Sequence, residues 1–312
     1  MPRPHAPRTR VSSYVSQWMP INIPSFEAFL YFTASGPTSV NKMSSDTETV
    51  TTTATGLSTT TNAIGTFADS GVAGYVPMGS SAYPHKFAFP SDTRSTLATA
   101  LSSQSRAMAC ASNNTVAGYI FAGADPCGAI IQKVAYPSDS ISTIAATTSN
   151  VLHHNSAFTN SGTAGYCAGG TLDGNIRHAT VDKLAFPAET KTSLGTGLTA
   201  AIWYGGGFAN SGVAGYVAGG QTTVRLNYID RFSLPADTKS TLSATLSTAR
   251  QQTACTGTYS SKSKCYIAGG NDSSGNLSQI VSLDSTETTS VISSTLTGAR
   301  IDGSGFADCG AF

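Results

Sequence analysis

The sequence predicts an all-β protein whose six similar units close into a β-propeller. Three observations carry this prediction: a repeated phrase, a composition that favours strands and turns, and chain ends that complement each other. The phrase reads AGYCAGG at 164–170 and AGYVAGG at 214–220. Its aromatic residue recurs every 43 to 50 residues, at Phe32, Tyr75, Tyr119, Tyr166, Tyr216 and Tyr266, and a glycine follows each by four residues. About four short strands in a repeat of this length are typical of a propeller blade.

Composition excludes several functional classes. Of the 312 residues, 11% are charged and 40% hydrophobic, and the net charge is +1. Such a chain has no strong field for nucleic acid or an anionic membrane, and it is too apolar to stay disordered. No apolar run approaches the ~20 residues of a membrane span, and the basic N-terminus lacks the apolar core of a signal peptide. We therefore expect neither nucleic-acid binding nor membrane insertion, and synthesis in a cytoplasm without signal-directed export.

Each unit continues in the same order after its glycine. An apolar strand ending in proline, such as DKLAFP, is followed by an acidic turn, a Thr- and Ser-rich strand and a strand of small residues. Proline ends a strand because it cannot donate to the ladder, and a turn acid can bond its own backbone. The turn acids recur, which predicts a structural role, since a catalytic pair would be unique. They are Asp92, Asp139, Glu189, Asp237 and Glu287, and the recurring Arg106, Arg250 and Arg300 are interpreted as packing or turn-capping groups.

The strands of small residues predict how the ring closes. They lie near 62–69, 107–112, 155–160, 204–210, 252–257 and 302–309. We expect them to be innermost, because strands crowd at the axis and only small residues fit there. The first unit lacks such a strand and the chain ends just after one, so the C-terminal strand should join the N-terminal blade. This predicts a six-bladed propeller over residues 25–312, preceded by an extended N-terminal arm over residues 1–24.

The order of these elements resembles the kelch repeat over roughly residues 26–312. The resemblance is carried by the strand ending in Gly-Gly, the IDRF-like strand at 229–232, the TKSTL strand at 238–242 and the arginine before the small-residue strand. The tryptophan that kelch units carry in their fourth strand is missing, since neither Trp18 nor Trp203 fills that place. The GY..GG and FP.DT wording also resembles repeats in bacteriophage structural proteins, particularly those of cyanophages. These resemblances imply a kelch-like propeller with a structural role in a virion.

The sequence gives no pattern for catalysis, a metal or a cofactor. The cysteines form no CxxC pair, and Cys110 and Cys255 occupy the place of a phenylalanine in other units, which predicts packing. His153 and His154 are adjacent on an expected strand and point to opposite faces, which disfavours joint chelation. The SxDxGxTW boxes of sialidases are absent, and five histidines make a copper-oxidase site hard to build. We therefore expect a protein that is not an enzyme.

Variable loops after the glycine are the candidate binding surface, because loops carry specificity while periodic residues hold a repeat scaffold. They span 80–85, 124–129, 171–178, 221–227 and 271–276, and they should share one face with the recurring arginines. Arg and Tyr are favoured at interfaces. The side chains best suited to contact a partner are Tyr83, His85, Arg177, His178 and Arg225. The alternative for each is an ordinary solvated loop residue.

The N-terminal arm is a second candidate. It is basic and proline-rich, and its Arg8, Arg10, Tyr14 and Trp18 could dock on another subunit and become ordered there. An unanchored terminus is the alternative.

The leading hypothesis is a non-enzymatic structural protein of a bacteriophage virion, as a tail fibre, baseplate or capsid-decoration subunit. Few charges and a closed β ring suit an exposed exterior, and release by lysis needs no signal peptide. Expected partners are other virion proteins, further copies of the chain and a host surface glycan. A cellular kelch-type adaptor or lectin-like protein is the alternative.

Overall fold

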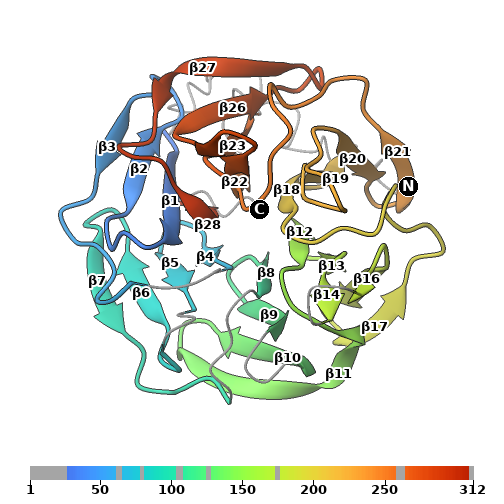
Figure 1. The fold of residues 1–312 in the computed structure, drawn as a ribbon. Coiled ribbons are helices and arrows are strands. Elements are labelled where there is room, and N and C mark those ends of the chain that lie inside the picture. The colour runs from blue at the N-terminus through green and yellow to red at the C-terminus, as the bar shows by residue number, and fades with distance from the viewer. Residues whose placement is uncertain are drawn as a thin grey trace, which may run out of the picture.

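The computed structural model describes residues 27–60, 65–77, 81–102, 108–123, 128–172, 176–257 and 264–308, and every regular element within them is a β-strand. Six four-stranded antiparallel sheets stand around a central axis (Figure 1). The predicted six-bladed, all-β propeller is confirmed.

The blades repeat one strand order, which runs from the innermost strand to the outermost. Blade 1 contains β28 (Ile301–Ala307), β1 (Phe29–Ser35), β2 (Asn41–Ser44) and β3 (Val50–Thr52). Blade 2 contains β4 (Phe67–Asp69), β5 (Ala73–Val76), β6 (His85–Ala88) and β7 (Thr93–Thr96). Blade 3 contains β8 (Ala109–Asn113), β9 (Ala117–Gly123), β10 (Gly128–Ala135) and β11 (Ser140–Leu152).

The second half of the ring adds two small hairpins to this plan. Blade 4 contains β12 (Ser156–Asn160), β13 (Ala164–Ala168), β16 (Val181–Ala185) and β17 (Thr190–Ser193). Blade 5 contains β18 (Gly206–Asn210), β19 (Ala214–Ala218), β20 (Ile229–Ser233) and β21 (Thr238–Thr241). Blade 6 contains β22 (Ala254–Gly257), β23 (Cys265–Ala268), β26 (Gln279–Leu283) and β27 (Thr289–Thr295). The hairpins are β14 (Thr171–Leu172) with β15 (Ile176–Arg177) and β24 (Asn271–Asp272) with β25 (Gly275–Asn276).

Ring closure occurs as predicted. The C-terminal β28 pairs antiparallel with the N-terminal β1, with Tyr31 opposite Phe306. The Phe29 amide also donates to Asp308 Oδ1 at 2.9 Å. Blade 1 is therefore composite, and the small-residue strand is innermost there as in the other blades (Figure 1). Closure removes the open sheet edge that a linear array would expose.

The glycine of the AGY phrase is required by packing between blades. A Cβ on Gly74 of blade 2 would lie 2.0 Å from the ring of Phe306 in blade 1. The pairs Gly118–Phe67 and Gly215–Phe158 repeat this arrangement. A phenylalanine from one innermost strand thus lies flat on the backbone of the next blade, and only glycine leaves room for it.

A set of contacts that we term the clasps joins each blade to the next. In blade 4, the Tyr166 hydroxyl donates to Asp237 Oδ1 of blade 5 at 2.6 Å, and Lys183 Nζ lies 2.6 Å from Asp237 Oδ2. The tyrosine–acid pairs of the other clasps are Tyr31–Asp92, Tyr75–Asp139, Tyr119–Glu189, Tyr216–Glu287 and Tyr266–Glu48. The last pair joins blade 6 to blade 1, so the clasps run round the whole ring. The structural role predicted for the turn acids is confirmed.

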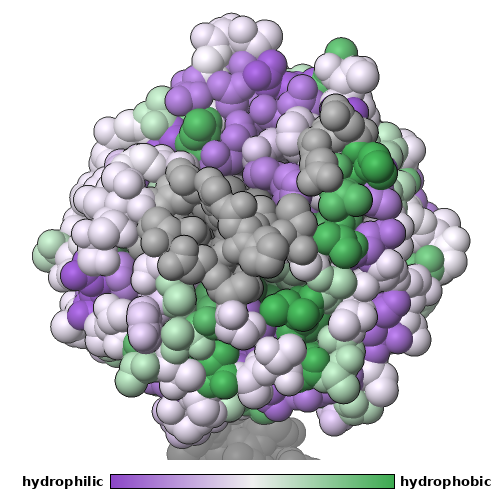
Figure 2. Space-filling view, turned by 60° about the horizontal axis from the view of Figure 1, so that its bottom comes forward, coloured by the Kyte–Doolittle hydropathy of each residue, from purple (hydrophilic) through white to green (hydrophobic). Residues whose placement is uncertain are grey.

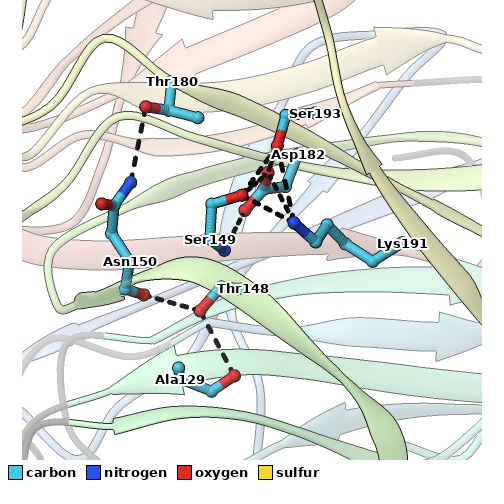
Figure 3. A network of polar contacts seen from close by, with 8 residues as sticks. All are labelled: Ala129, Thr148, Ser149, Asn150, Thr180, Asp182, Lys191 and Ser193. Carbon is cyan, nitrogen blue, oxygen red and sulfur yellow. Dashed lines mark hydrogen bonds and ion pairs between the residues drawn. The ribbon is translucent and has the colours of Figure 1, made fainter.

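A second set, the locks, joins the fourth strand of each blade, or the segment that follows it, to the third strand of the next blade. The buried Asp182 of blade 4 accepts the Ser149 amide at 2.6 Å and the Ser149 hydroxyl at 2.7 Å from blade 3 (Figure 3). Ser193 donates to the same carboxylate at 2.7 Å. The other locks are Ser58–His85, Ser102–Gln132, Thr199–Asp230, Ser247–Gln279 and Thr297–Asn41. Clasps and locks together use most of the periodic polar residues as internal fastenings.

The repeat alignment of blade 1 is wrong by one residue. Tyr31, and not Phe32, takes the place of the repeated tyrosine, because it pairs with Lys42 and donates to Asp92 at 2.7 Å. The two aromatic residues are adjacent, and the sequence alone does not say which one faces the clasp.

The expected alignment of Cys110 and Cys255 with the phenylalanine of other blades is also wrong by one residue. Ala111 lies opposite Tyr119 and Thr256 opposite Tyr266, where other blades have phenylalanine. Cys110 and Cys255 precede these positions by one residue and therefore face the other side of their strands. Both are buried and line the axial cavity, so packing is still their role.

Candidate binding site on the hairpin face

The two ends of the propeller carry different connections. One end, the turn face, carries the tight turns that join first to second and third to fourth strands. The other end, the hairpin face, carries the variable loops and the segments that lead into the next blade. The Gly220 amide donates to the Arg250 carbonyl at 2.9 Å, and the Gly270 amide donates to the Arg300 carbonyl at 2.8 Å. The described variable loops at 221–227 and 271–276 therefore share a face with these two arginines, as predicted, while Arg106 and most of the loop at 124–129 lie outside the described residues.

The two described arginines are part of the scaffold. Arg250 is fully buried and donates to the Gly269 carbonyl at 3.3 Å and to Ser247 at 3.0 Å. Arg300 donates to the Ser39 carbonyl at 2.7 Å across the junction of blades 6 and 1. The packing role predicted for both residues is confirmed.

A groove lies between the hairpin-face loops of blades 5 and 6. The paired glycines Gly219 and Gly220 have φ values of 62° and 92°, which lets the chain leave the second strand sharply. The loop that follows approaches the next hairpin, and the Arg225 guanidinium donates to Asn271 Oδ1. The groove, which we term the hairpin groove, has a volume of about 510 Å³, and Asp272 and Val224 are among the residues lining it.

Among the described residues, four with left-handed backbone lie beside the axial channel at its hairpin-face end. They are His154 (φ 54°), Tyr204 (φ 57°), Gln252 (φ 59°) and Asp302 (φ 48°), one at the start of each innermost strand in blades 4, 5, 6 and 1. The Tyr204 amide donates to the His154 carbonyl at 2.9 Å, and the Gln252 amide donates to the Tyr204 carbonyl at 3.0 Å. The clasp acids Asp92, Asp139, Glu189, Asp237 and Glu287 also have left-handed backbone, so this conformation recurs in the repeat scaffold as well as at the mouth.

Aromatic rings gather beside these residues. The His154 ring lies 3.9 Å from the Tyr204 ring and 5.8 Å from the Trp203 ring, measured between centroids. Arg177 of β15 places its guanidinium 5.4 Å from the centre of the Trp203 ring. We term His154, Trp203, Tyr204, Gln252 and Asp302 the mouth cluster. It presents aromatic faces together with hydrogen-bonding groups.

The polar groups of the mouth cluster lie in a partly dehydrated setting. Burial raises the pKa of the Asp302 carboxyl, against the smaller effect of the hydrogen bond from Gln252. Burial also raises the pKa of Tyr204, and the nearby Asp302 adds to this shift. Tyr204 consequently stays protonated and available as a donor at neutral pH.

The axial channel below the mouth is narrow and polar. Its cavity measures about 70 Å³, and Asn155, Ser156, Thr253 and Ser304 are among the residues lining it. A volume of this size holds a few water molecules but no organic ligand. A ligand at this end would therefore rest on the mouth cluster, outside the channel.

Arg177 and His178 lie together on the hairpin of blade 4, where Arg177 contacts the mouth cluster and His178 pairs with Ile202. Arg225 borders the hairpin groove. Tyr83 is 46% exposed but belongs to blade 2, so blade 3 separates it from the hairpin of blade 4. The structure brings Arg177 and His178 into one region, borders it with Arg225, and leaves Tyr83 apart.

His85 is not available for contact, which corrects the expectation. It begins β6, is 2% exposed, and its Nε2 is 2.9 Å from the Ser58 hydroxyl. It holds the place that Asp182 and Gln132 hold in other blades, so it is a member of the locks. The loop that precedes it ends one residue earlier than expected.

Trp203, Tyr204, Gln252 and Asp302 were not among the expected binding residues. The sequence contains a spacing signal for these residues. A dipeptide precedes each of the last four small-residue strands at intervals of 48 to 50 residues: HH (153–154), WY (203–204), QQ (251–252) and ID (301–302). Their chemical variety hides this period from an alignment built on identical letters. The arm residues Arg8, Arg10, Tyr14 and Trp18 lie outside the described residues.

The described residues also provide evidence on metal binding, on the role of Asp272, on membrane spans and on surface hydropathy. Among the described residues, no three His, Cys, Asp or Glu side chains lie close enough to hold a metal ion. Asp272 accepts the amides of Ser274 and Gly275 at 2.7 and 3.1 Å, so it shapes a turn. No described helix is long and apolar enough to cross a membrane. Figure 2 shows hydrophobic residues in small groups among weakly polar ones.

Comparison with known proteins supports the propeller fold and no more than the fold. A solved structure described as that of YjhT superimposes with a TM-score of 0.65, over 84% of this chain and 94% of that chain, at 12% sequence identity. At this identity the likeness shows the propeller fold alone. No protein-family model matches the chain, and no curated protein matches it.

Proposed function

We propose that this chain is a non-enzymatic structural protein of a bacteriophage virion that presents its hairpin face to a protein or a host glycan. One observation carries the binding role. The polar residues whose types recur are used in clasps and locks, whereas Trp203, Arg177 and Arg225, whose residue types do not recur at their repeat positions, lie on one face. In a repeat scaffold, the residues that break the period on one face are the ones free to specify a partner.

Absence of enzymatic activity is part of the proposal. The repeated acids are each held by a tyrosine and a cation, so they are not poised for proton transfer. The four described cysteines are all buried, and burial raises the pKa of the thiols of Cys110, Cys167, Cys255 and Cys265. A buried thiol with a raised pKa is a poor nucleophile.

The virion assignment rests on the chain as a whole. The GY..GG and FP.DT wording of the repeats resembles phage structural proteins, and a closed ring with 11% charged residues suits an exposed particle. Residues 1–24 would attach the propeller to a neighbouring subunit through Arg8, Arg10, Tyr14 and Trp18. The hairpin face would then point away from that attachment to meet its partner.

Incorporation into particles tests the virion assignment. The full chain and a version lacking residues 1–24 are expressed in infected cells, and purified particles are analysed by mass spectrometry. The full chain is expected in the particles and the shortened chain is expected to be lost from them while staying folded by circular dichroism. Particles that never contain the full chain refute the virion role and leave the adaptor or lectin-like alternative, which the hairpin groove also fits.

A further inference from the structure

We infer that the mouth cluster is a saccharide-binding site in which a pyranose ring rests against Trp203 and donates and accepts hydrogen bonds around the channel mouth. This deepens the proposed binding role and assigns it to a chemical class. It rests on the hairpin face being the binding face, and it does not depend on the chain being part of a virion.

Unpartnered polar atoms around the mouth are the first argument. Among the described residues, Trp203 Nε1 and Arg177 Nε are buried donors without a hydrogen-bond partner. Asn155 Oδ1 and Gln251 Oε1 are buried acceptors in the same condition. Buried polar atoms are normally paired, so unpartnered donors and acceptors in and beside the mouth cluster need an explanation. The described ring has five further unpartnered atoms elsewhere, on Asp69, His85, Arg225, Tyr228 and Arg300.

The mixture of donors and acceptors selects the ligand class. A phosphate would satisfy only the donors, and a cation only the acceptors. An apolar ligand would satisfy neither group. A sugar hydroxyl is both a donor and an acceptor, so an array of hydroxyls can pair with the donor Trp203 Nε1 and with the acceptor Gln251 Oε1, which lies beside Gln252.

The aromatic geometry supplies the second argument. Trp203 stands edge-on to His154, at an interplanar angle of 89°, and Tyr204 is tilted between them. Arg177 lies over the Trp203 ring and covers it. A pyranose ring, which has an apolar face and a polar rim, suits this surface once the flexible Arg177 side chain moves aside. The guanidinium then becomes a donor at the edge of the sugar.

Backbone geometry holds the site in place. His154, Tyr204, Gln252 and Asp302 sit on consecutive blades in left-handed conformations, and described amide–carbonyl hydrogen bonds link the first three. Gln252 Nε2 also donates to Asp302 Oδ1, which fixes the carboxyl against the channel. A site fixed by the scaffold loses little conformational entropy on binding.

Tryptophan fluorescence provides a direct test, because the chain contains only two tryptophans, Trp18 and Trp203. In a Trp18→Phe protein the emission reports on Trp203 alone. The probes are the methyl pyranosides of glucose, galactose, mannose, rhamnose and N-acetylglucosamine, with inorganic phosphate and cyclohexanol as controls. At least one pyranoside is expected to shift the emission with saturation, and neither control is expected to do so.

Matched substitutions locate the site. Asp302→Asn keeps a residue type that tolerates left-handed backbone, and it should weaken binding at least tenfold. Asp284→Asn makes the same chemical change on the turn face and should leave binding unchanged. Arg225→Ala tests the hairpin groove. Loss of binding in the Arg225 variant alone places the ligand in the groove and overturns the inference, as does an equal response to phosphate or no response to any pyranoside.

The two proposals fail separately. Particles that lack the chain refute the virion role while a saturating pyranoside titration still stands. Particles that contain the chain, together with an unresponsive Trp203, refute the saccharide site and leave the virion role intact.

Discussion

Substitution of Gly215 by alanine tests whether blade packing dictates the AGY phrase. The added Cβ would lie 2.0 Å from Cδ2 of Phe158, where ordinary contact begins at 3.4 Å. The ring would have to retreat by the difference, about 1.4 Å, but it stacks on Tyr166 at 4.6 Å and on Phe232 at 5.3 Å. Overpacking of this kind costs about 3 kcal/mol of unfolding free energy when the neighbours cannot yield.

A double-mutant cycle with Phe158→Ala separates the clash from other effects. Phe158→Ala alone leaves a cavity and should cost about 4 kcal/mol. Once the phenylalanine is gone, the alanine at 215 has space, so the double variant should cost about 4 kcal/mol rather than the sum of about 7. Equilibrium urea unfolding at constant m-value measures each variant.

Gly195→Ala is the matched control, because a Cβ there meets nothing within 4 Å and its backbone is not left-handed. It should change the unfolding free energy by less than about 0.5 kcal/mol. Additive costs for Gly215→Ala and Phe158→Ala, with no coupling energy, would refute the packing explanation of the repeated glycine.

The fastenings of the ring give three further predictions. Burial, with a smaller effect of Arg94, lowers the pKa of His85 to about 4. The unfolded chain therefore binds a proton below about pH 6.5 that the folded chain does not bind, so the unfolding free energy should decrease as the pH is lowered from about 6.5 to about 4. His85→Gln, which copies the lock residue of blade 3, should flatten this dependence in urea titrations, and an unchanged slope would contradict it. Asp237→Ala leaves the Tyr166 hydroxyl and Lys183 without their acceptor and should lower the unfolding free energy by about 2 kcal/mol, whereas Asp237→Asn keeps an acceptor for the hydroxyl and should lower it by about 1 kcal/mol. Equal losses of unfolding free energy in urea would argue against the clasp. Deletion of residues 301–312 removes the innermost strand of blade 1 and should abolish the single cooperative thermal transition, so a normal transition by calorimetry would disprove closure.

The fold could be predicted from the sequence because its physical requirements recur. Gly74, Gly118 and Gly215 each accommodate a phenylalanine from the preceding blade, so the same letters return at the same spacing. Ring closure followed from the missing strand of the first unit. The errors occurred where two similar residues are adjacent, as at Tyr31 and Phe32, because the spacing of a degenerate unit does not fix the strand register.

The candidate site was less predictable because its residues occupy equivalent backbone positions in successive blades but have different types of side chain. His154 and Asp302 occupy equivalent positions, yet no substitution rule relates them. His85 shows the opposite error, in which a residue typical of binding surfaces lies in a periodic structural position. Its role became visible only when the contact with Ser58 joined it to the other locks.

The length of the repeat differs round the ring. The repeated tyrosines are 44 residues apart between Tyr75 and Tyr119, but 50 apart between Tyr166 and Tyr216 and between Tyr216 and Tyr266. Within these two spacings the connections on the hairpin face form β14–β15 and the Gln221–Arg225 bridge, and the corresponding connection of blade 6, after Tyr266, forms β24–β25. Clasps and locks are kept in these blades, so the additional residues leave the ring fastened. Most of them extend the hairpin face, but two lie on the turn face of blade 6, where Tyr266 follows its strand partner Thr256 by ten residues and Tyr166 follows Phe158 by eight. The mouth cluster and the hairpin groove both lie beside these longer connections, so the proposed binding surface coincides with the part of the hairpin face that the longer units extend.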